Sequence, residues 1–130
     1  MIRYEEAVPD MEQLYRLYEN DSWNDFLKLP KETLYKAMEQ SWLVINAYDG
    51  ERLIGTGRII SDGIINAYLC GLIVEPAYRS KGIGREMVGR LAERCTQAHL
   101  HLQLLAEEEK APYYEQLGFE VFTLGLKYTS

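Results

Sequence analysis

The sequence predicts an α/β (α+β) domain built on one mixed, mostly antiparallel sheet with helices on both faces. Two segments with helical spacing come first, and three β-like segments joined by short turns follow them, which is typical of an antiparallel meander. A strand, a glycine-containing loop, a long helix and another strand come next and form a crossover. With 130 residues, 47% of them hydrophobic and 26% charged, we expect a single domain over residues 1–130.

The first two expected elements are amphipathic helices. The first covers Met11–Glu19 and follows Asp10, whose side chain is suited to cap it, with Gln13 three residues further on. Pro30 fits the first turn of a second helix, which ends near Gln40.

Apolar, β-branched segments bounded by turn residues predict the strands. They are Trp42–Tyr48, Leu53–Ile60, Ile64–Val74, Leu100–Leu105, Phe119–Phe122 and Leu124–Tyr128. Residues 49–51 and 61–63 are turns that join the first three strands. Helical spacing predicts a long helix over Ile83–Gln97, and Gly118 ends a short helix over Tyr113–Leu117.

Charge and composition exclude several classes of protein. The formal net charge of −6 and a pI near 5.0 disfavour a nucleic-acid-binding protein, which normally presents a basic face. We see no secretory signal at the start and no apolar stretch long enough to cross a membrane. Cys70 and Cys95 fit no metal or redox spacing, so we expect two buried free thiols in a reducing cytoplasm and no metal site.

The strongest chemical signal is the pattern Arg79-x-x-Gly82-x-Gly84 between an apolar strand and a helix. The first N–H groups of a helix lack backbone partners, and the helix dipole adds positive potential there. Glycines leave room for a diphosphate to approach the backbone, and Lys81 and Arg85 add charge. The pattern therefore predicts a phosphate-binding loop.

The loop has three other interpretations. An ordinary tight turn also uses two glycines. A Walker loop requires a Gly-Lys-Ser/Thr ending that is missing here, and a dinucleotide fingerprint requires a small residue where this chain has Met87. Glu107 lies about where a ribose-binding acid would follow, but one crossover is too little for a dinucleotide fold.

Two segments resemble the signatures of the GCN5-related N-acetyltransferase (GNAT) family. Residues Leu72–Gly84 resemble its acetyl-CoA-binding motif, and Tyr113–Phe119 resembles its aromatic-Tyr-Glu-x-Leu-Gly-Phe motif, in the expected order. The resemblance implies the GNAT fold, which is a mixed sheet of about six to seven strands with a splayed central parallel pair. It also implies acetyl-CoA as cosubstrate and an acetyl-CoA-dependent N-acetyltransferase activity.

A weaker resemblance connects the chain with the plant serotonin (arylalkylamine) N-acetyltransferase branch. Residues 18–23, Arg52–Gly55, Arg58 and 61–62 carry it. That branch acts on aromatic and other small amines, so the resemblance implies a small-molecule amine as acceptor.

The GNAT resemblance also implies roles for individual positions. The pyrophosphate would be held by Arg79, Ser80, Lys81, Gly82, Ile83, Gly84 and Arg85. The pantetheine arm would lie along Leu72, Ile73 and Val74, and the N–H of Leu72 or of Val74 would bond the thioester oxygen. Tyr114 would lie beside the sulfur as the proton donor. Many relatives carry an asparagine where this chain has Glu107, which leaves that pantetheine contact open.

The sequence leaves the general base and the acceptor contacts open. Possible bases are Glu75, Asp62, His99, His101 and Glu107. We assign acceptor binding to the loop that contains Tyr18, Trp23 and Phe26; Trp23 would alternatively be a core residue or a dimer contact.

The predicted reaction is direct attack of the amine on acetyl-CoA. A Ser-His-Asp set is not evident, and neither cysteine has an obvious base partner, so a covalent acetyl-enzyme is not expected. Acetylation of a protein N-terminus or lysine, and a non-catalytic acyl-CoA sensor, are the alternatives. We expect a homodimer, and neither nucleic acid nor membrane as partner.

Overall fold

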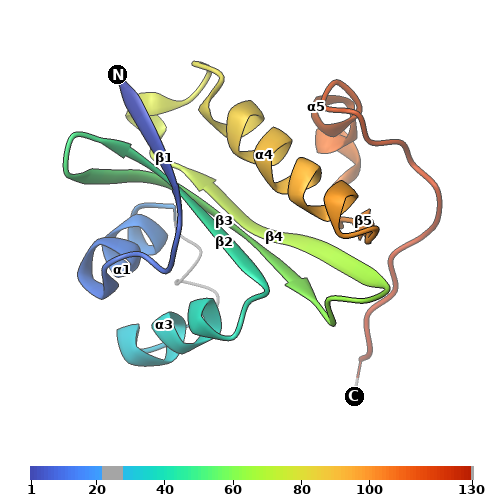
Figure 1. Ribbon diagram of the computed structural model, residues 1–130, viewed down its shortest axis with the longest axis horizontal. Coiled ribbons are helices and arrows are strands. Elements are labelled where there is room, and N and C mark those ends of the chain that lie inside the picture. The colour runs from blue at the N-terminus through green and yellow to red at the C-terminus, as the bar shows by residue number, and fades with distance from the viewer. Residues whose placement is uncertain (22–27, 130) are drawn as a thin grey trace.

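The computed structural model describes residues 1–21 and 28–129, and a twisted sheet forms its centre (Figure 1). In the described residues the sheet has five strands in the order β1-β2-β3-β4-β5. They are β1 (Ile2–Glu6), β2 (Leu43–Asp49), β3 (Arg52–Ser61), β4 (Asn66–Val74) and β5 (His101–Gln103). Neighbours are antiparallel from β1 to β4, whereas β4 and β5 are parallel, so the predicted mixed, mostly antiparallel sheet is confirmed.

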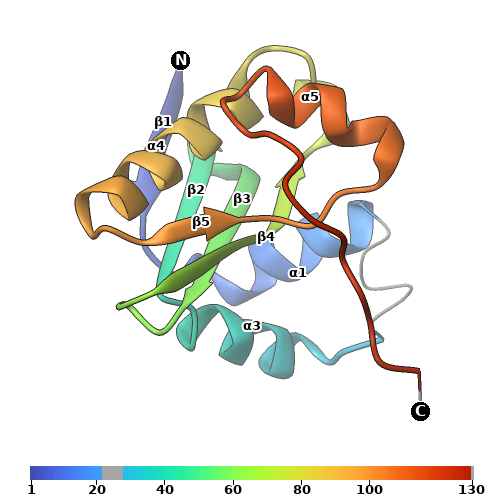
Figure 2. The ribbon, with the colours of Figure 1, turned by 90° about the vertical axis from the view of Figure 1, so that its right-hand side faces the viewer.

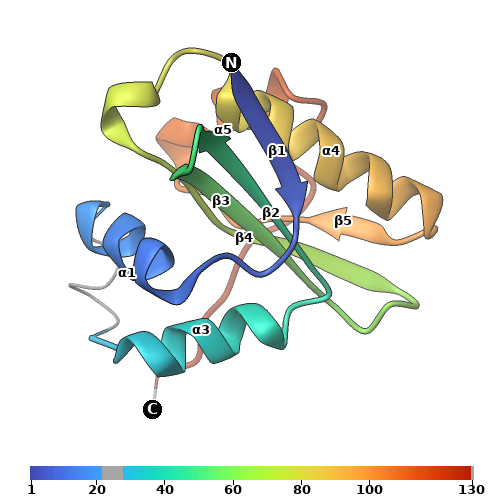
Figure 3. The ribbon, with the colours of Figure 1, turned by 60° about the vertical axis from the view of Figure 1, so that its left-hand side comes forward.

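Helices cover both faces of the sheet, as predicted. They are α1 (Met11–Asn20), α3 (Lys31–Glu39), α4 (Ile83–Gln97) and α5 (Ala111–Glu115), with 3₁₀ turns at Pro76–Tyr78 and Glu108–Lys110. Helices α1 and α3 lie side by side on one face, and α4 lies across the other (Figures 1 and 3). The bounds of α4 are those that the helical spacing predicts, and Asp10 caps α1 through a 3.0 Å bond from the Gln13 N–H to its Oδ2 atom.

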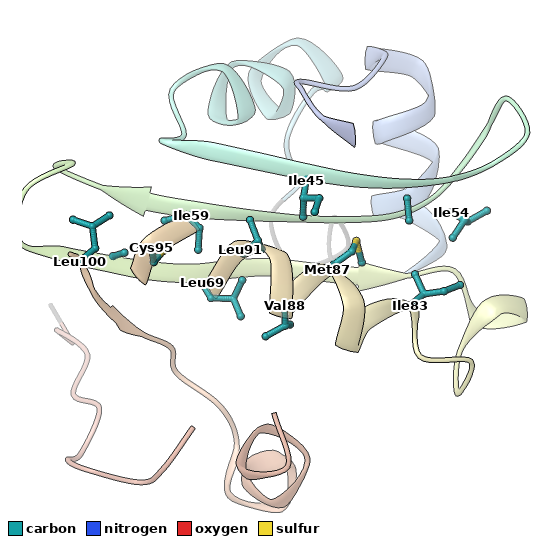
Figure 4. Close-up of a cluster of buried hydrophobic side chains, with 12 residues drawn as sticks. Ile45, Ile54, Ile59, Leu69, Ile83, Met87, Val88, Leu91, Cys95 and Leu100 are labelled. Carbon is teal, nitrogen blue, oxygen red and sulfur yellow. The ribbon is translucent and has the colours of Figure 1, made fainter. Parts of the chain in front are cut away.

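The larger core lies between α4 and the sheet. Met87, Val88 and Leu91 form the buried face of α4 and pack against sheet residues such as Ile45 and Ile59 (Figure 4). Burying a side chain of this size contributes about 1.5–3 kcal/mol each. This packing fixes the start of α4 against the end of β4.

A second core lies between the sheet and the two N-terminal helices. Leu14 and Leu17 of α1 and Leu34 and Met38 of α3 are almost fully buried against the sheet. Tyr18 belongs to the same cluster and is only 3% exposed.

Strand β1 was not predicted. It pairs with β2 from Ile2↔Asp49 to Glu6↔Ile45, but only Ile2 and Tyr4 turn toward the α4 core. A five-residue edge strand with two inward side chains gives too short an alternation to be recognised.

The two predicted C-terminal strands are wrong. Residues 119–129 follow α5 as a coil along the outside of the sheet, and the sheet has five described strands instead of six or seven (Figures 1 and 2). Strand β5 is short and ends at Gln103, so it does not offer residues 119–129 an edge long enough to pair with. It touches the rest of the chain through side chains: Phe122 packs edge-on against His101, with 5.6 Å between ring centroids.

Candidate active site

A groove of about 1510 Å³ opens where β4 and β5 separate. The two strands pair only from Asn66↔His101 to Tyr68↔Gln103, and beyond that point β4 has no described partner on this side. Figure 2 shows β5 leaving β4 and leading toward α5. The groove is lined by β4, the loop before α4, the residues after β5, and α5. The splayed parallel pair that the GNAT resemblance implied is therefore present, but it lies at the edge of the described sheet and not at its centre, because β5 is the last strand.

The backbone of β4 presents hydrogen-bonding groups to this groove. Glu75 donates its N–H to the carbonyl of Ile54 at 2.8 Å, so its backbone faces β3. Backbone direction alternates along a strand, so the N–H and C=O groups of Leu72 and Val74 face the open side. Both residues line the groove, whereas Ile73 points into the second core and is 1% exposed.

A β-bulge interrupts β4 at Gly71. Thr56 pairs with Ile73 and Arg58 with Cys70, so Gly71 and Leu72 together face the single residue Gly57. Gly71 has φ +58°, and a Cβ there would lie 2.7 Å from the Tyr18 hydroxyl oxygen. Only glycine therefore fits this conformation beside Tyr18. The bulge changes the direction of the β4 backbone where Gly71 lines the groove.

The predicted phosphate loop lies at one end of the groove. Within residues 1–21 and 28–129, the backbone N–H groups of residues 80–85 donate to no protein acceptor. Gly82 precedes α4 with φ +82°, a conformation that glycine adopts without strain. Ser80, Gly82, Ile83, Gly84 and Arg85 line the groove there. The loop therefore offers a row of free donors at a helix start, which suits a diphosphate.

The two glycines of the loop have different roles. Nothing lies within 4 Å of the position that a Cβ of Gly82 would take, so Gly82 is needed for its φ angle. At Gly84 a Cβ would lie 3.0 Å from the Tyr113 hydroxyl oxygen, so a side chain there would require Tyr113 of α5 to shift slightly. The sequence gave no indication that Tyr113 touches the loop.

The basic side chains near the loop are not equally available. Arg79 donates from Nε to the carbonyl of Val74 at 3.0 Å and is ion-paired with Asp21. Lys81 lies over the ring of Tyr78, with 5.9 Å from Nζ to the centroid, and only Arg85 of the three lines the groove without a described carboxylate partner. Arg79 thus connects Val74, at the end of β4, to Asp21.

Tyr114 lies at the groove, as the sequence implied. Its ring packs edge-on against Tyr113 and Phe119, with centroid distances of 5.2 and 6.1 Å, and it is partly buried against the main core. Burial, assisted by Tyr113, raises the pKa of Tyr114 above its ordinary value of 10.0. The phenol is therefore protonated at neutral pH and suited to donate a proton.

Four of the five possible bases lie away from the groove: Glu75, Asp62, His99 and His101 are not among its lining residues. Asp62 accepts hydrogen bonds from the N–H groups of Ile64 and Ile65, both at 2.8 Å. These bonds lower the pKa of Asp62.

Glu75 is buried and holds two elements together. Its carboxylate accepts from Arg16 of α1 at 2.9 Å and from Nε of Arg52 at 3.1 Å. The hydrogen bond from Arg52, with the charge of Arg16, lowers the pKa of Glu75. Glu75 therefore joins α1 to the end of β4.

Among the described residues, Asp21 and Glu107 are the carboxylates that line the groove. Burial raises the pKa of Asp21, which is ion-paired with Arg79 across 58 positions in the sequence. A hydrogen bond with the neighbouring Glu109 raises the pKa of Glu107. Asp21 was missed because its neighbourhood in the sequence resembles a plain polar loop.

The predicted acceptor residues fall into two groups. Tyr18 reaches the bulge through its hydroxyl but is otherwise a core residue. Trp23 and Phe26 lie outside the described residues. Cys70 is only partly buried and lines the groove, so the expectation of two buried thiols is wrong for Cys70 and confirmed for Cys95.

Helices of the described ranges are too short or too polar to cross a membrane. Across the same ranges, no three His, Cys, Asp or Glu side chains are grouped to hold a metal ion.

The separated parallel strands and the unpartnered start of α4 form a groove whose geometry suits a nucleotide-linked acyl carrier. The pattern of the family described as "Acetyltransferase (GNAT) domain" matches residues 7–125, so the chain belongs to the GNAT acetyltransferase family. Among solved structures, the GNAT-family acetyltransferase of Streptococcus pneumoniae TIGR4 has the same fold, with a TM-score of 0.80 over 100% of this chain and 98% of that one at 24% identity.

Two plant proteins illustrate the range of its relatives. Histone acetyltransferase TAP1 of Glycine max is 26% identical over 130 residues, which cover 91% of this chain and 55% of that protein. Serotonin N-acetyltransferase 2, chloroplastic, of Oryza sativa subsp. japonica is 31% identical over 99 residues, which cover 72% and 50%. The chain thus spans about half the length of these curated relatives. Their names divide between protein and small-molecule acceptors.

Proposed function

We propose that this protein transfers the acetyl group of acetyl-CoA to the primary amine of a small molecule. The observation that carries the proposal is the continuity of one groove. The groove joins the free N–H groups of residues 80–85, the open edge of β4 and the phenol of Tyr114. A diphosphate, a pantetheine arm and a thioester would meet these features in that order.

The phosphate end fits acetyl-CoA through its backbone. Free N–H groups at the start of α4 and the helix dipole attract the pyrophosphate, and Arg85 adds a full charge. The N–H and C=O groups of Leu72 and the N–H of Val74 would pair with the amides of pantetheine, much as a continuation of β5 would, whereas the C=O of Val74 already accepts from Arg79.

The reaction would be direct transfer. The amine nitrogen attacks the thioester carbon, and the N–H of Leu72 beside the bulge stabilises the oxyanion, a contribution of about 2.7–4 kcal/mol. The C–S bond then breaks, the thiolate of coenzyme A takes a proton from Tyr114, and the proton released by the amine restores the phenol through solvent. Asp21, a carboxylate that lines the groove, would accept that proton from the amine and pass it to solvent.

The test is turnover of acetyl-CoA with a panel of small amines, followed by release of the coenzyme A thiol. We expect thiol release that depends on the amine and yields the N-acetyl product in equal amount. Binding of coenzyme A without turnover of any amine or peptide would contradict an enzyme and favour an acyl-CoA sensor.

The second candidate is acetylation of a protein lysine or N-terminus, which the name of the soybean relative favours. A histone-derived peptide in the same assay decides between the two. A kcat/KM for the peptide well above that of every small amine would replace the proposed acceptor class.

A further inference from the structure

Arg58 of β3 has an unsatisfied donor next to the acceptor end of the groove. Its Nε atom is buried and, in the described residues, has no hydrogen-bond partner. One terminal nitrogen, Nη1, donates to Ser41 Oγ at 3.3 Å, which is long for such a bond. An unpaired buried donor of a charged group costs folding free energy, so a ligand that pairs with this guanidinium would remove that cost.

The charge of Arg58 is also unbalanced. Other arginines of the described ranges are paired with carboxylates: Arg3, Arg16, Arg52, Arg79, Arg90 and Arg94. Arg58 has no such partner there, although it is half-buried. Arg85 likewise has none, but it is exposed at the phosphate end, where the cosubstrate would supply the anion.

Arg58 does not itself line the groove, but it neighbours residues that do. In the register of β3 and β4 it faces Cys70, and the next pair on the same sheet face is Ile60 with Tyr68, both of which are exposed. Cys70, Ile60 and Tyr68 all line the groove. The Nε atom lies 3.8 Å from the position that a Cβ of Gly71 would take, directly beside the bulge.

The protein offers Arg58 a hydroxyl group but no anion. The hydroxyl of Tyr18 lies 2.7 Å from that same Cβ position at Gly71, so it is next to the guanidinium. Burial raises the pKa of Tyr18, and the neighbouring charge of Arg58 opposes that rise without removing it. Tyr18 is therefore neutral at physiological pH and leaves the positive charge of Arg58 uncompensated.

We propose that the acceptor is an amine that also carries a carboxylate, as an amino acid does, and that Arg58 binds this carboxylate. The proposal rests on the proposed function and names its substrate class. A guanidinium presents its N–H groups as a planar fork that matches the two oxygens of a carboxylate. A cation at this place also disfavours the ammonium form of the acceptor and so favours the neutral amine that attacks.

The test compares amines in matched pairs. The twenty amino acids and their decarboxylated counterparts, such as phenylalanine with phenethylamine, are assayed with wild type, Arg58→Met and Arg58→Lys. Arg3→Gln is the matched control, because Arg3 is an exposed arginine of β1 away from the groove. In wild type we expect the higher kcat/KM for the carboxylated member of the preferred pair.

In Arg58→Met we expect kcat/KM for the carboxylated member to fall by about 10- to 100-fold, as for the loss of one hydrogen-bonded charge pair. The value for its decarboxylated partner should change less than about threefold by the same reasoning, since that amine lacks the bonded group. Arg58→Lys keeps the charge without the fork and should lie between wild type and Arg58→Met. Arg3→Gln should not change either member.

A second measurement needs no turnover of the carboxylate. 3-Phenylpropionate has the carboxylate but no amine and should compete with the amine acceptor in wild type, and this inhibition should be lost in Arg58→Met. Thermal unfolding identifies a variant that fails to fold, and Arg58→Lys then replaces it in both assays.

Two results would overturn the role of Arg58 while the acetyltransferase function stands: a higher wild-type kcat/KM for the decarboxylated amines, or an equal fall in kcat/KM for both members of a pair in Arg58→Met. Absence of turnover with any amine would instead contradict the proposed function itself. The two failures are therefore distinguishable.

Discussion

The two ends of the groove are built from different parts of the chain. At the phosphate end the donors are backbone N–H groups of one continuous segment, residues 80–85, at the start of α4. At the proposed acceptor end the groups are side chains from distant segments: Tyr18 of α1, Asp21 directly after α1, Arg58 of β3 and Cys70 of β4. A backbone site suits an invariant diphosphate, whereas a side-chain site is free to change with the acceptor.

The largest effect on stability is expected for Glu75, which links α1 to the end of β4. Glu75→Gln removes the buried carboxylate that holds Arg16 and Arg52, and we expect the free energy of unfolding to fall by about 3 kcal/mol. Urea unfolding at pH 7 measures this. Glu5→Gln, which removes a carboxylate from the exposed pair with Arg3, is the control and should cost less than about 1 kcal/mol.

The same carboxylate predicts a pH dependence. The folded-state pKa of Glu75 lies below its ordinary value of 4.5. Its contribution to stability is therefore complete above about pH 4.5 and is lost as the pH falls from there through the folded-state value. Wild type should lose stability in this window more steeply than Glu75→Gln; parallel curves would show that Glu75 is not the group responsible.

Tyr114 is the residue that we propose to act on the reacting atoms. We expect Tyr114→Phe to lower kcat at least about tenfold, since the leaving thiolate loses its proton donor, without changing the affinity for coenzyme A. Tyr113→Phe, the adjacent phenol, should retain kcat. Stopped assays of thiol release give kcat, and calorimetry gives the affinity; an unchanged kcat in Tyr114→Phe would remove Tyr114 from the mechanism.

The phosphate end could be predicted from the sequence, whereas the acceptor end could not. The phosphate loop and α4 were predictable because glycines, basic residues and helical spacing all lie within about twenty consecutive residues. The acceptor end was not, because Asp21 meets Arg79 only through tertiary packing and Arg58 shares a sheet face with Cys70 through strand register. Local patterns carry no information on such contacts.

The errors in the fold have the same origin. The segment over Leu124–Tyr128 alternates like a strand, but pairing depends on a distant edge, and β5 ends at Gln103 before offering one. Conversely, Ile2–Glu6 is a strand because β2 supplies an edge, despite only two inward apolar residues. The homodimer and the cytoplasmic location remain predictions.

Gly82 tests whether the phosphate end depends on backbone conformation. Gly82→Ala forces a side chain into the left-handed region, which costs about 1–2 kcal/mol, although no atom lies in its way. Gly82→Asn should cost less, because asparagine tolerates this region better. Urea unfolding orders the three proteins, and equal stabilities would show that the loop adopts another conformation in solution.

The smallest effect is expected for a basic side chain at the backbone end. Lys81 is exposed and does not line the groove, so Lys81→Ala should raise the KM for acetyl-CoA by only about two- to threefold, less at high salt. A tenfold or larger rise would mean that side chains, and not the backbone, dominate phosphate binding. Steady-state kinetics at two ionic strengths measures it.

Glu75, the residue after β4, is ion-paired with Arg16 of α1. Since α1 contains Tyr18 and ends just before Asp21, any change of acceptor specificity in this helix still depends on that ion pair. A different first helix grafted onto this scaffold would have to retain a cation at position 16. Without it, Glu75 would lose its partner on α1, and the end of β4 beside the groove would be less firmly held.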